Sequence, residues 1–180
     1  MMIAADFTNE KLVIGVLVGD RGLEERLLSS LAASFGPIDH RSAVLDFTYT
    51  SYYDEEMGKP IVRFFVSFQN LVSPDRLASI KLATNALEKD FAVAGKRKIN
   101  LDPGLLALSR FILASTKNSS HRVPLGGGIY AEIELMFEKG SFRPVEWTYS
   151  DYRSEAYIKI LNEIREIYKR NLKAAGPSRA

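Results

Sequence analysis

Strand-like and helix-like patterns alternate through the first hundred residues in an order that few folds accommodate. Short apolar runs and period-two alternation predict strands, whereas leucines at helical spacing predict helices. The predicted elements are strands at 11–20, 38–49, 61–68 and 95–104 and helices at 22–36 and 73–91. The resulting order, β-α-β-β-α-β, is that of the ferredoxin-like split βαβ arrangement, in which two helices cover one face of an antiparallel sheet.

The second helix has the clearest start signal in the chain. Ser73 occupies an N-cap position, Pro74 follows at the first helical position, and Asp75 lies in the first turn. The strand after this helix ends in Asn100–Gly104, where the Asp-Pro-Gly sequence predicts a turn.

The second half of the chain predicts a β-meander and one amphipathic helix. A short helix running into a strand is expected at 105–116, and the final helix begins near Ser154. We expect the meander to extend the first sheet, because no linker separates the halves. The predicted organisation is an N-terminal arm (1–10), a single α+β domain (11–173) with a ferredoxin-like half (11–104) and a meander-plus-helix half (105–173), and a disordered tail (174–180).

Composition limits the kind of partner. With 24 basic and 22 acidic residues the net charge is +2, so nucleic acid is not an expected partner. The absence of cysteine excludes disulfides and thiolate chemistry and suits a reducing compartment. The chain shows neither a secretory signal nor an apolar run long enough for a membrane helix. We therefore expect a soluble cytoplasmic protein without a membrane partner.

The segment 114–132 gathers the side chains that anion-binding sites use. Lys117, His121 and Arg122 precede three consecutive glycines, and they would together supply a point charge, a proton-bearing ring and a bidentate fork. The glycines connect two strand-like segments, so a hairpin turn is the simpler interpretation of Gly126–Gly128. No P-loop is present, because the segment after the first strand lacks the required Lys and Ser or Thr. GTP or ATP binding by that route is not expected.

Two carboxylates follow on the next strand. Glu132 and Glu134 share a predicted strand face with Tyr130, and two such carboxylates can hold Mg²⁺ or Mn²⁺. The interpretation favoured by the pattern alone is a solvated strand face, with Lys117 and Arg122 as cross-strand ion partners.

Three single residues are weaker candidates for ligand binding or catalysis. Trp147 could stack on a ligand ring, although an aromatic lid over the core is the simpler interpretation. Asp102 is an acid or metal ligand only if the predicted turn carries chemistry. Imidazole catalysis would have to rest on His121, because no nucleophile and base form a recognisable motif.

Two groups of residues are further candidates for ligand contact. Lys81, Asn85 and Glu88 share one face of the second helix, where surface ion pairs are the usual outcome. The connection at 50–60 is long and rich in tyrosine and acid, and loops of this length are often functional or mobile. Its candidate residues are Tyr52, Tyr53 and Glu56.

Several segments together resemble one prokaryotic family, domain of unknown function 4416. They are FGPIDHRS, YYDEEMGKP, SFQNLVSPDRLASIKLATNALE, GKRKINLDPG, LASTKNSSHRVPLGGGIYAE and EWTYSDY. The resemblance spans about residues 11–173. It implies no mechanism, ligand or catalytic residue. Members sometimes carry the label GTP-binding protein, which the missing P-loop and guanine motif do not support.

The residues favour a protein that binds a small anionic or phosphorylated ligand, with or without a metal ion. The alternative is a non-catalytic binding or regulatory module that acts through a homodimer or a protein partner. Both hypotheses leave open whether the protein is an enzyme. RNA binding through the sheet is disfavoured, because the strands lack the aromatic and basic pattern of RNA-binding sheets.

Overall fold

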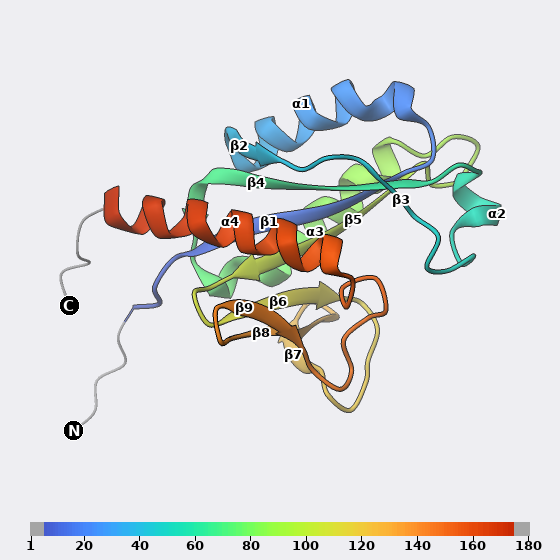
Figure 1. Cartoon of the computed structure of the whole chain (residues 1–180). Helices are drawn as coiled ribbons and strands as arrows, with labels where there is room; N and C mark the ends of the chain where they lie inside the picture. The colour runs from blue at the N-terminus through green and yellow to red at the C-terminus, as the bar shows by residue number, and fades with distance from the viewer. Residues whose placement is uncertain (1–5, 175–180) are drawn as a thin grey trace.

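The computed structural model describes residues 6–174, and these form a nine-stranded antiparallel open sheet with helices on both of its faces (Figure 1). The strands are β1 (Glu10–Val18), β2 (Ile38–Arg41), β3 (Leu45–Asp46), β4 (Val62–Val72), β5 (Ile99–Leu106), β6 (Arg110–Ser115), β7 (Val123–Gly126), β8 (Ile129–Glu138) and β9 (Ser141–Pro144). The helices are α1 (Glu24–Phe35), α2 (Asp54–Met57), α3 (Leu77–Asp90) and α4 (Glu155–Ala174).

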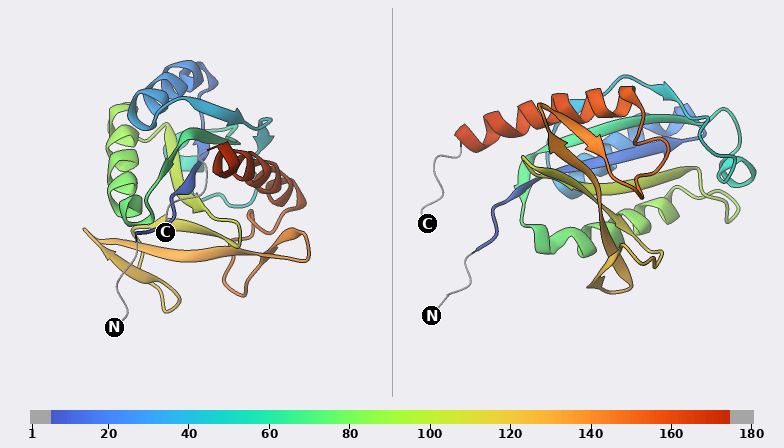
Figure 2. Two further views of the ribbon diagram at one scale, coloured as in Figure 1. Left: turned by 90° about the vertical axis from the view of Figure 1, so that its left-hand side faces the viewer. Right: turned by 60° about the horizontal axis from the view of Figure 1, so that its bottom comes forward.

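The strand order is β2-β4-β1-β5-β6-β8-β7, with β3 paired to β4 and β9 paired to β8. The second half of the chain continues the sheet of the first, because β6 pairs with β5. Figure 2 shows that this continuation turns at a steep angle to β1 and β4. β7 ends the sheet, and all four of its residues are exposed.

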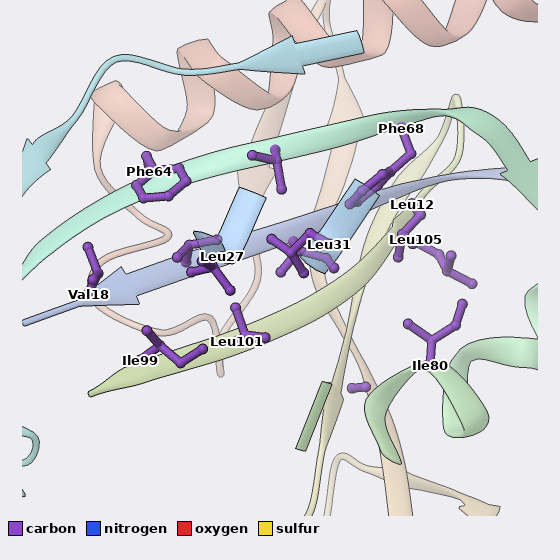
Figure 3. Packing of buried hydrophobic residues seen from close by; sticks show 14 of the residues in the cluster. Leu12, Val18, Leu27, Leu31, Phe64, Phe68, Ile80, Ile99, Leu101 and Leu105 are labelled. Atoms are coloured by element: carbon purple, nitrogen blue, oxygen red, sulfur yellow. The ribbon is translucent and has the colours of Figure 1, made fainter. Parts of the chain in front are cut away.

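Alternation along the central strands divides the interior into two cores. Leu12, Phe64 and Phe68 face α1 and α3 and pack with Leu27 and Leu31 of α1 (Figure 3). Side chains of the opposite parity, such as Val13 and Phe65, pack instead beneath α4. This two-sided burial explains why Leu12–Val18 of β1 form a run without polar side chains, since every residue of the run is buried.

The predicted start of the second helix is confirmed in position. The chain enters α3 through a 3₁₀ turn at Pro74–Arg76, with Ser73 in the N-cap conformation ahead of it. The Ser73 side chain itself makes no capping hydrogen bond. Of the residues at the ends, 1–5 and 175–180 lie outside the described part of the chain, and with them half of the predicted arm (1–10) and most of the predicted tail (174–180).

The helix predicted within 105–116 is wrong. β5 continues to Leu106, and β6 follows after a tight turn. Leu105 and Leu106 are both buried although they point to opposite faces, so the apolar run has no polar alternation. A run of this kind does not distinguish a helix from a strand that is covered on both faces.

The turn predicted at Asp102–Gly104 is also wrong, because these residues lie inside β5. β5 pairs with β1 along its whole length, but it pairs with β6 only at Gly104–Leu106. Before Gly104 the two strands diverge, while β6 stays paired with β8 as far as Ser115. Proline is tolerated there, since beyond the divergence no strand of residues 6–174 lies on that side of β5 to receive an N–H.

None of the helices in residues 6–174 combines the length and apolar character needed to cross a bilayer.

Candidate functional site

A cleft of about 780 Å³ opens where β5 and β6 diverge. One wall comes from α3, and a second comes from the end of β6 and the residues that follow it. The segments 47–53 and 149–152 complete the enclosure. The cleft is therefore a consequence of sheet geometry, because the gap between two separating strands is covered but not filled.

The floor of the cleft is built on a buried arginine. Arg63 on β4 is 2% exposed, and its Nη1 donates to Oδ2 of Asp102 at 2.9 Å. Its Nη2 donates to Oδ2 of Asp151 at 3.4 Å. The guanidinium also lies 5.4 Å from the ring centre of Phe47 and 5.8 Å from that of Phe65. One permanent cation thus holds two carboxylates that line the cleft.

Gly15, in the middle of β1, makes room for this floor. A Cβ atom at Gly15 would lie 2.7 Å from Nη1 of Arg63 and 3.0 Å from the hydroxyl of Tyr152. The absent side chain therefore leaves the space in which the guanidinium and the phenol sit above the central strand. We call Arg63, Asp102, Asp151 and Tyr152 the cleft floor.

The two floor carboxyls differ in pKa. Burial acts to raise the pKa of Asp102, but the charges of Arg63 and Lys81 and its hydrogen bonds outweigh burial and lower that pKa. Burial raises the pKa of Asp151, and the charge of Arg63 compensates only in part. Asp102 is therefore an ionised, acceptor-only group at neutral pH.

The surface ion pairs predicted for α3 are wrong, because Lys81 and Glu88 are buried, 7% and 6% exposed. Lys81 Nζ donates to the carbonyl oxygen of Leu101 at 2.8 Å, and Oε1 of Glu88 accepts from the Leu101 N–H at 2.7 Å. In a continuous sheet these peptide groups would bond to β6. The helix side chains replace the missing strand, which is why α3 carries charge on its buried face.

The connection between β3 and β4 supplies an aromatic wall. Phe47, Tyr49, Tyr52 and Tyr53 all line the cleft. Behind them, Glu56 of α2 accepts from Nε and Nη2 of Arg97 at 2.7–3.0 Å. This bidentate pair anchors the wall to the segment that leads into β5.

The segment 114–132 is partly assembled as the sequence predicts. His121 Nε2 lies 2.7 Å from Oε2 of Glu132, and Arg122 Nη2 lies 2.9 Å from Oε1 of the same carboxylate. The predicted cross-strand ion pair between Arg122 and Glu132 is therefore confirmed. Lys117 does not join it, because its Nζ lies 4.8 Å above the ring of Tyr52 at the cleft. The glycines form the predicted turn, with φ values of 112°, 60° and 76°.

Trp147 and Tyr130 do not line the cleft. The Trp147 ring stacks on His121 with 5.2 Å between ring centres, and its Nε1 donates to the carbonyl oxygen of Ile133 at 2.8 Å. Tyr130 is half-buried and pairs in register with Ser115 of β6. Trp147 thus fixes the imidazole that contacts Glu132, rather than covering the core.

The solvated strand face favoured for Glu132 and Glu134 is wrong, because these residues are 3% and 0% exposed. A bulge in β8 inserts Glu134 between the residues opposite Phe111 and Ile112, so Glu134 and its neighbour Leu135 both turn inward. Oε1 of Glu134 accepts from the Tyr149 N–H at 2.7 Å. Within residues 6–174, no three His, Cys, Asp or Glu side chains are grouped to hold a metal ion.

Glu134 should make stability depend on pH. Burial, reinforced by the charges of Glu132 and Asp151, raises the pKa of Glu134 to about 8 from 4.5. The unfolded chain releases this proton at lower pH than the folded one, so stability falls as the pH rises between those values. Glu134→Gln cannot ionise, so its free energy of unfolding does not carry this loss. Relative to the wild type, we expect the free energy of unfolding of Glu134→Gln to increase by on the order of 3 kcal/mol as the pH is raised from 5 to 8.

Urea unfolding at the two pH values measures this gain. Glu138→Gln is the matched control, since Glu138 is exposed on the same strand. Equal pH slopes for the wild type and Glu134→Gln would show that Glu134 ionises normally in the folded protein.

A family model described as Domain of unknown function (DUF4416) matches residues 8–168. No curated protein and no solved structure matches the chain. The matched range includes all the residues that line the cleft.

Proposed function

The chain belongs to the DUF4416 family, and we propose that it functions by binding a small anionic ligand, a phosphorylated compound in particular, in the cleft between β5 and β6. The observation that carries this proposal is a set of three lysines that line the cleft and form no ion pair within residues 6–174. We call Lys81, Lys89 and Lys117 the cleft lysines.

The cleft lysines differ from the other cations nearby. Arg63 and Arg97 also line the cleft, but both are ion-paired with carboxylates. The ion-paired lysines of residues 6–174 are Lys11, Lys59 and Lys169, none of which lines the cleft. Lys89 and Lys117 therefore carry positive charge that is available to a ligand, whereas the charge of Lys81 also acts on Asp102 and Glu88.

Lys81 provides the strongest single contact. It is buried, and its one hydrogen bond, to the carbonyl oxygen of Leu101, uses one of three ammonium N–H groups. A phosphate oxygen could accept from the remaining N–H groups, and charge-assisted bonds of this kind are stronger in a partly desolvated site. The aromatic wall offers ring surfaces against which the rest of a ligand can pack.

Removing one cleft lysine should weaken phosphate binding. For Lys117→Ala we expect the dissociation constants of inorganic pyrophosphate and AMP to rise about tenfold, the equivalent of one charge-assisted hydrogen bond. Calorimetric titration measures this change. Lys169→Ala is the matched control, since it removes the same charge from α4, outside the cleft. Equal affinities of the two variants for pyrophosphate and AMP would show that Lys117 does not contact the ligand.

We further propose that residues 10–106 form a ferredoxin-like half. The order β2-β4-β1-β5, antiparallel throughout, supports this, as does the packing of α1 and α3 against the same core. On this proposal β6–β9 and α4 are additions to that half, and the cleft lies at the junction between the half and the additions.

A further inference from the structure

We propose that the cleft floor is a subsite for hydroxyl groups, so that the ligand is a phosphate ester of a polyhydroxylated compound, a sugar or a nucleoside. This inference rests on the proposed function and adds the part of the ligand that lies away from its phosphate. The first observation that supports it is the size of the cleft. A volume of about 780 Å³ lies in the range of sites for whole small molecules and leaves most of its space empty around a bare phosphate.

The floor carboxylates are the acceptors that such a ligand would meet. The side chains of Asp102 and Asp151 are 25% and 11% exposed, whereas that of Arg63 is 3% exposed. Asp102 accepts one bond at each oxygen, from Asn100 and from Arg63, which leaves lone pairs free on both. An ionised carboxylate has no proton to donate, so its ligand partner must be a donor. Hydroxyl groups meet this need, as in ribose recognition by acidic side chains.

A hydroxyl fits the floor better than an ammonium group does. The same carboxylates already face the guanidinium of Arg63, and the charge of Lys81 also acts on Asp102. Arg63 and Lys81 would repel a cationic ligand group, whereas a neutral hydroxyl donates its hydrogen bond without that electrostatic cost.

Tyr152 supplies an independent observation. It is 2% exposed and lines the cleft, and its buried hydroxyl has no hydrogen-bond partner in the described part of the chain. This hydroxyl lies beside the Arg63 guanidinium above Gly15. An unsatisfied buried hydroxyl destabilises the protein, and a ligand oxygen that reaches it would relieve that loss. The cleft floor thus offers both carboxylate acceptors and a hydroxyl donor. A sugar hydroxyl can donate a hydrogen bond to the first and accept one from the second.

A series of phosphate esters tests this inference on the intact protein. We expect ribose 5-phosphate to bind at least tenfold more tightly than propyl phosphate, which has the ester but no hydroxyl. In Asp151→Asn this gap should shrink to less than threefold, whereas the control Asp75→Asn, exposed outside the cleft, should keep it. Tyr152→Phe is a second variant that removes only the unpartnered hydroxyl, and it should also narrow the gap.

The outcomes separate the two proposals. Equal affinity for ribose 5-phosphate and propyl phosphate would overturn the hydroxyl subsite and leave anion binding in place. Tightest binding of phosphoethanolamine would also overturn it, in favour of an ammonium subsite. Failure of every phosphate to bind would overturn the proposed function itself. If the expected gap is found, AMP distinguishes the source: tighter binding of AMP than of ribose 5-phosphate indicates a nucleotide, and weaker or equal binding indicates a free sugar phosphate.

Discussion

Replacing Arg63 with leucine is expected to lower the free energy of unfolding by about 3–5 kcal/mol, the usual cost of leaving a buried charge without its partner. Arg63 is the cation that contacts both Asp102 and Asp151, and it is almost completely buried. Without it, the two carboxylates would remain near each other at the cleft floor with no guanidinium to compensate their charge. Urea unfolding at pH 7 measures the loss.

Two further variants show that the loss comes from the floor. Arg143→Leu removes the same charge from an exposed position on β9 and should cost less than about 1 kcal/mol, as surface substitutions do. Adding Asp102→Asn and Asp151→Asn to Arg63→Leu should restore part of the stability, because the uncompensated charges are then removed. A cost for Arg63→Leu as small as that of Arg143→Leu would contradict the buried network.

Gly104→Ala is expected to destabilise the protein by about 3 kcal/mol, at the upper end for overpacking, because the new methyl group has no space. Its Cβ would lie 2.4 Å from the carbonyl oxygen of Ile112 and 2.6 Å from Cζ of Phe111. The first clash is with backbone, so relief requires β5 and β6 to separate where they are still paired. A thermal unfolding curve measures this loss.

Gly22→Ala is the control for the substitution itself. Its Cβ would lie 3.2 Å from Oδ1 of the exposed Asp20 side chain, which accepts from the Gly22 N–H at 2.9 Å and needs to shift only slightly. We expect the melting temperature of Gly22→Ala to stay close to that of the wild type. If Gly104→Ala melts together with Gly22→Ala, the close approach of β5 and β6 at the closed end of the cleft is refuted.

Much of the first half of the fold could be predicted from local patterns. Each predicted strand and helix of residues 11–104 corresponds to an element of the structure, although the segment 38–49 forms two short strands instead of one. Local rules failed at Asp102–Gly104, where an Asp-Pro-Gly sequence typical of turns lies inside a strand. The reason is not local: β5 loses its neighbour β6 at this point, and α3 takes over the hydrogen bonds.

The candidate site was predictable only where its residues are close in sequence. His121, Arg122 and Glu132 lie within one hairpin, and the sequence indicates their proximity, but of the three only Glu132 lines the cleft. Arg63 and Asp151 are 88 residues apart, and only the tertiary fold brings β4 and the connection between β9 and α4 together. The signals were a single arginine in the apolar β4 and a glycine in the middle of the apolar β1, but neither identifies its partners.

Charged residues were misplaced for one physical reason. Sequence patterns place charged residues on the surface, so they predict exposed positions for Lys81, Glu88 and Glu134. All three are buried next to interruptions of the sheet, the first two at the divergence of β5 from β6 and the third at the bulge in β8. Where a sheet is interrupted, buried peptide groups need side-chain partners, and charged residues can supply them.

The most direct test of the account is a backbone amide NMR titration of the wild-type protein with ribose 5-phosphate. If the cleft is the binding site, the largest shift changes should fall on the residues of α3 that line it, on 115–117 at the end of β6 and just after it, and on 149–152. The change should saturate with a single dissociation constant. Changes confined to α4, whose lysines lie outside the cleft, or no change at millimolar ligand, would contradict the proposal that this protein binds an anionic ligand between β5 and β6.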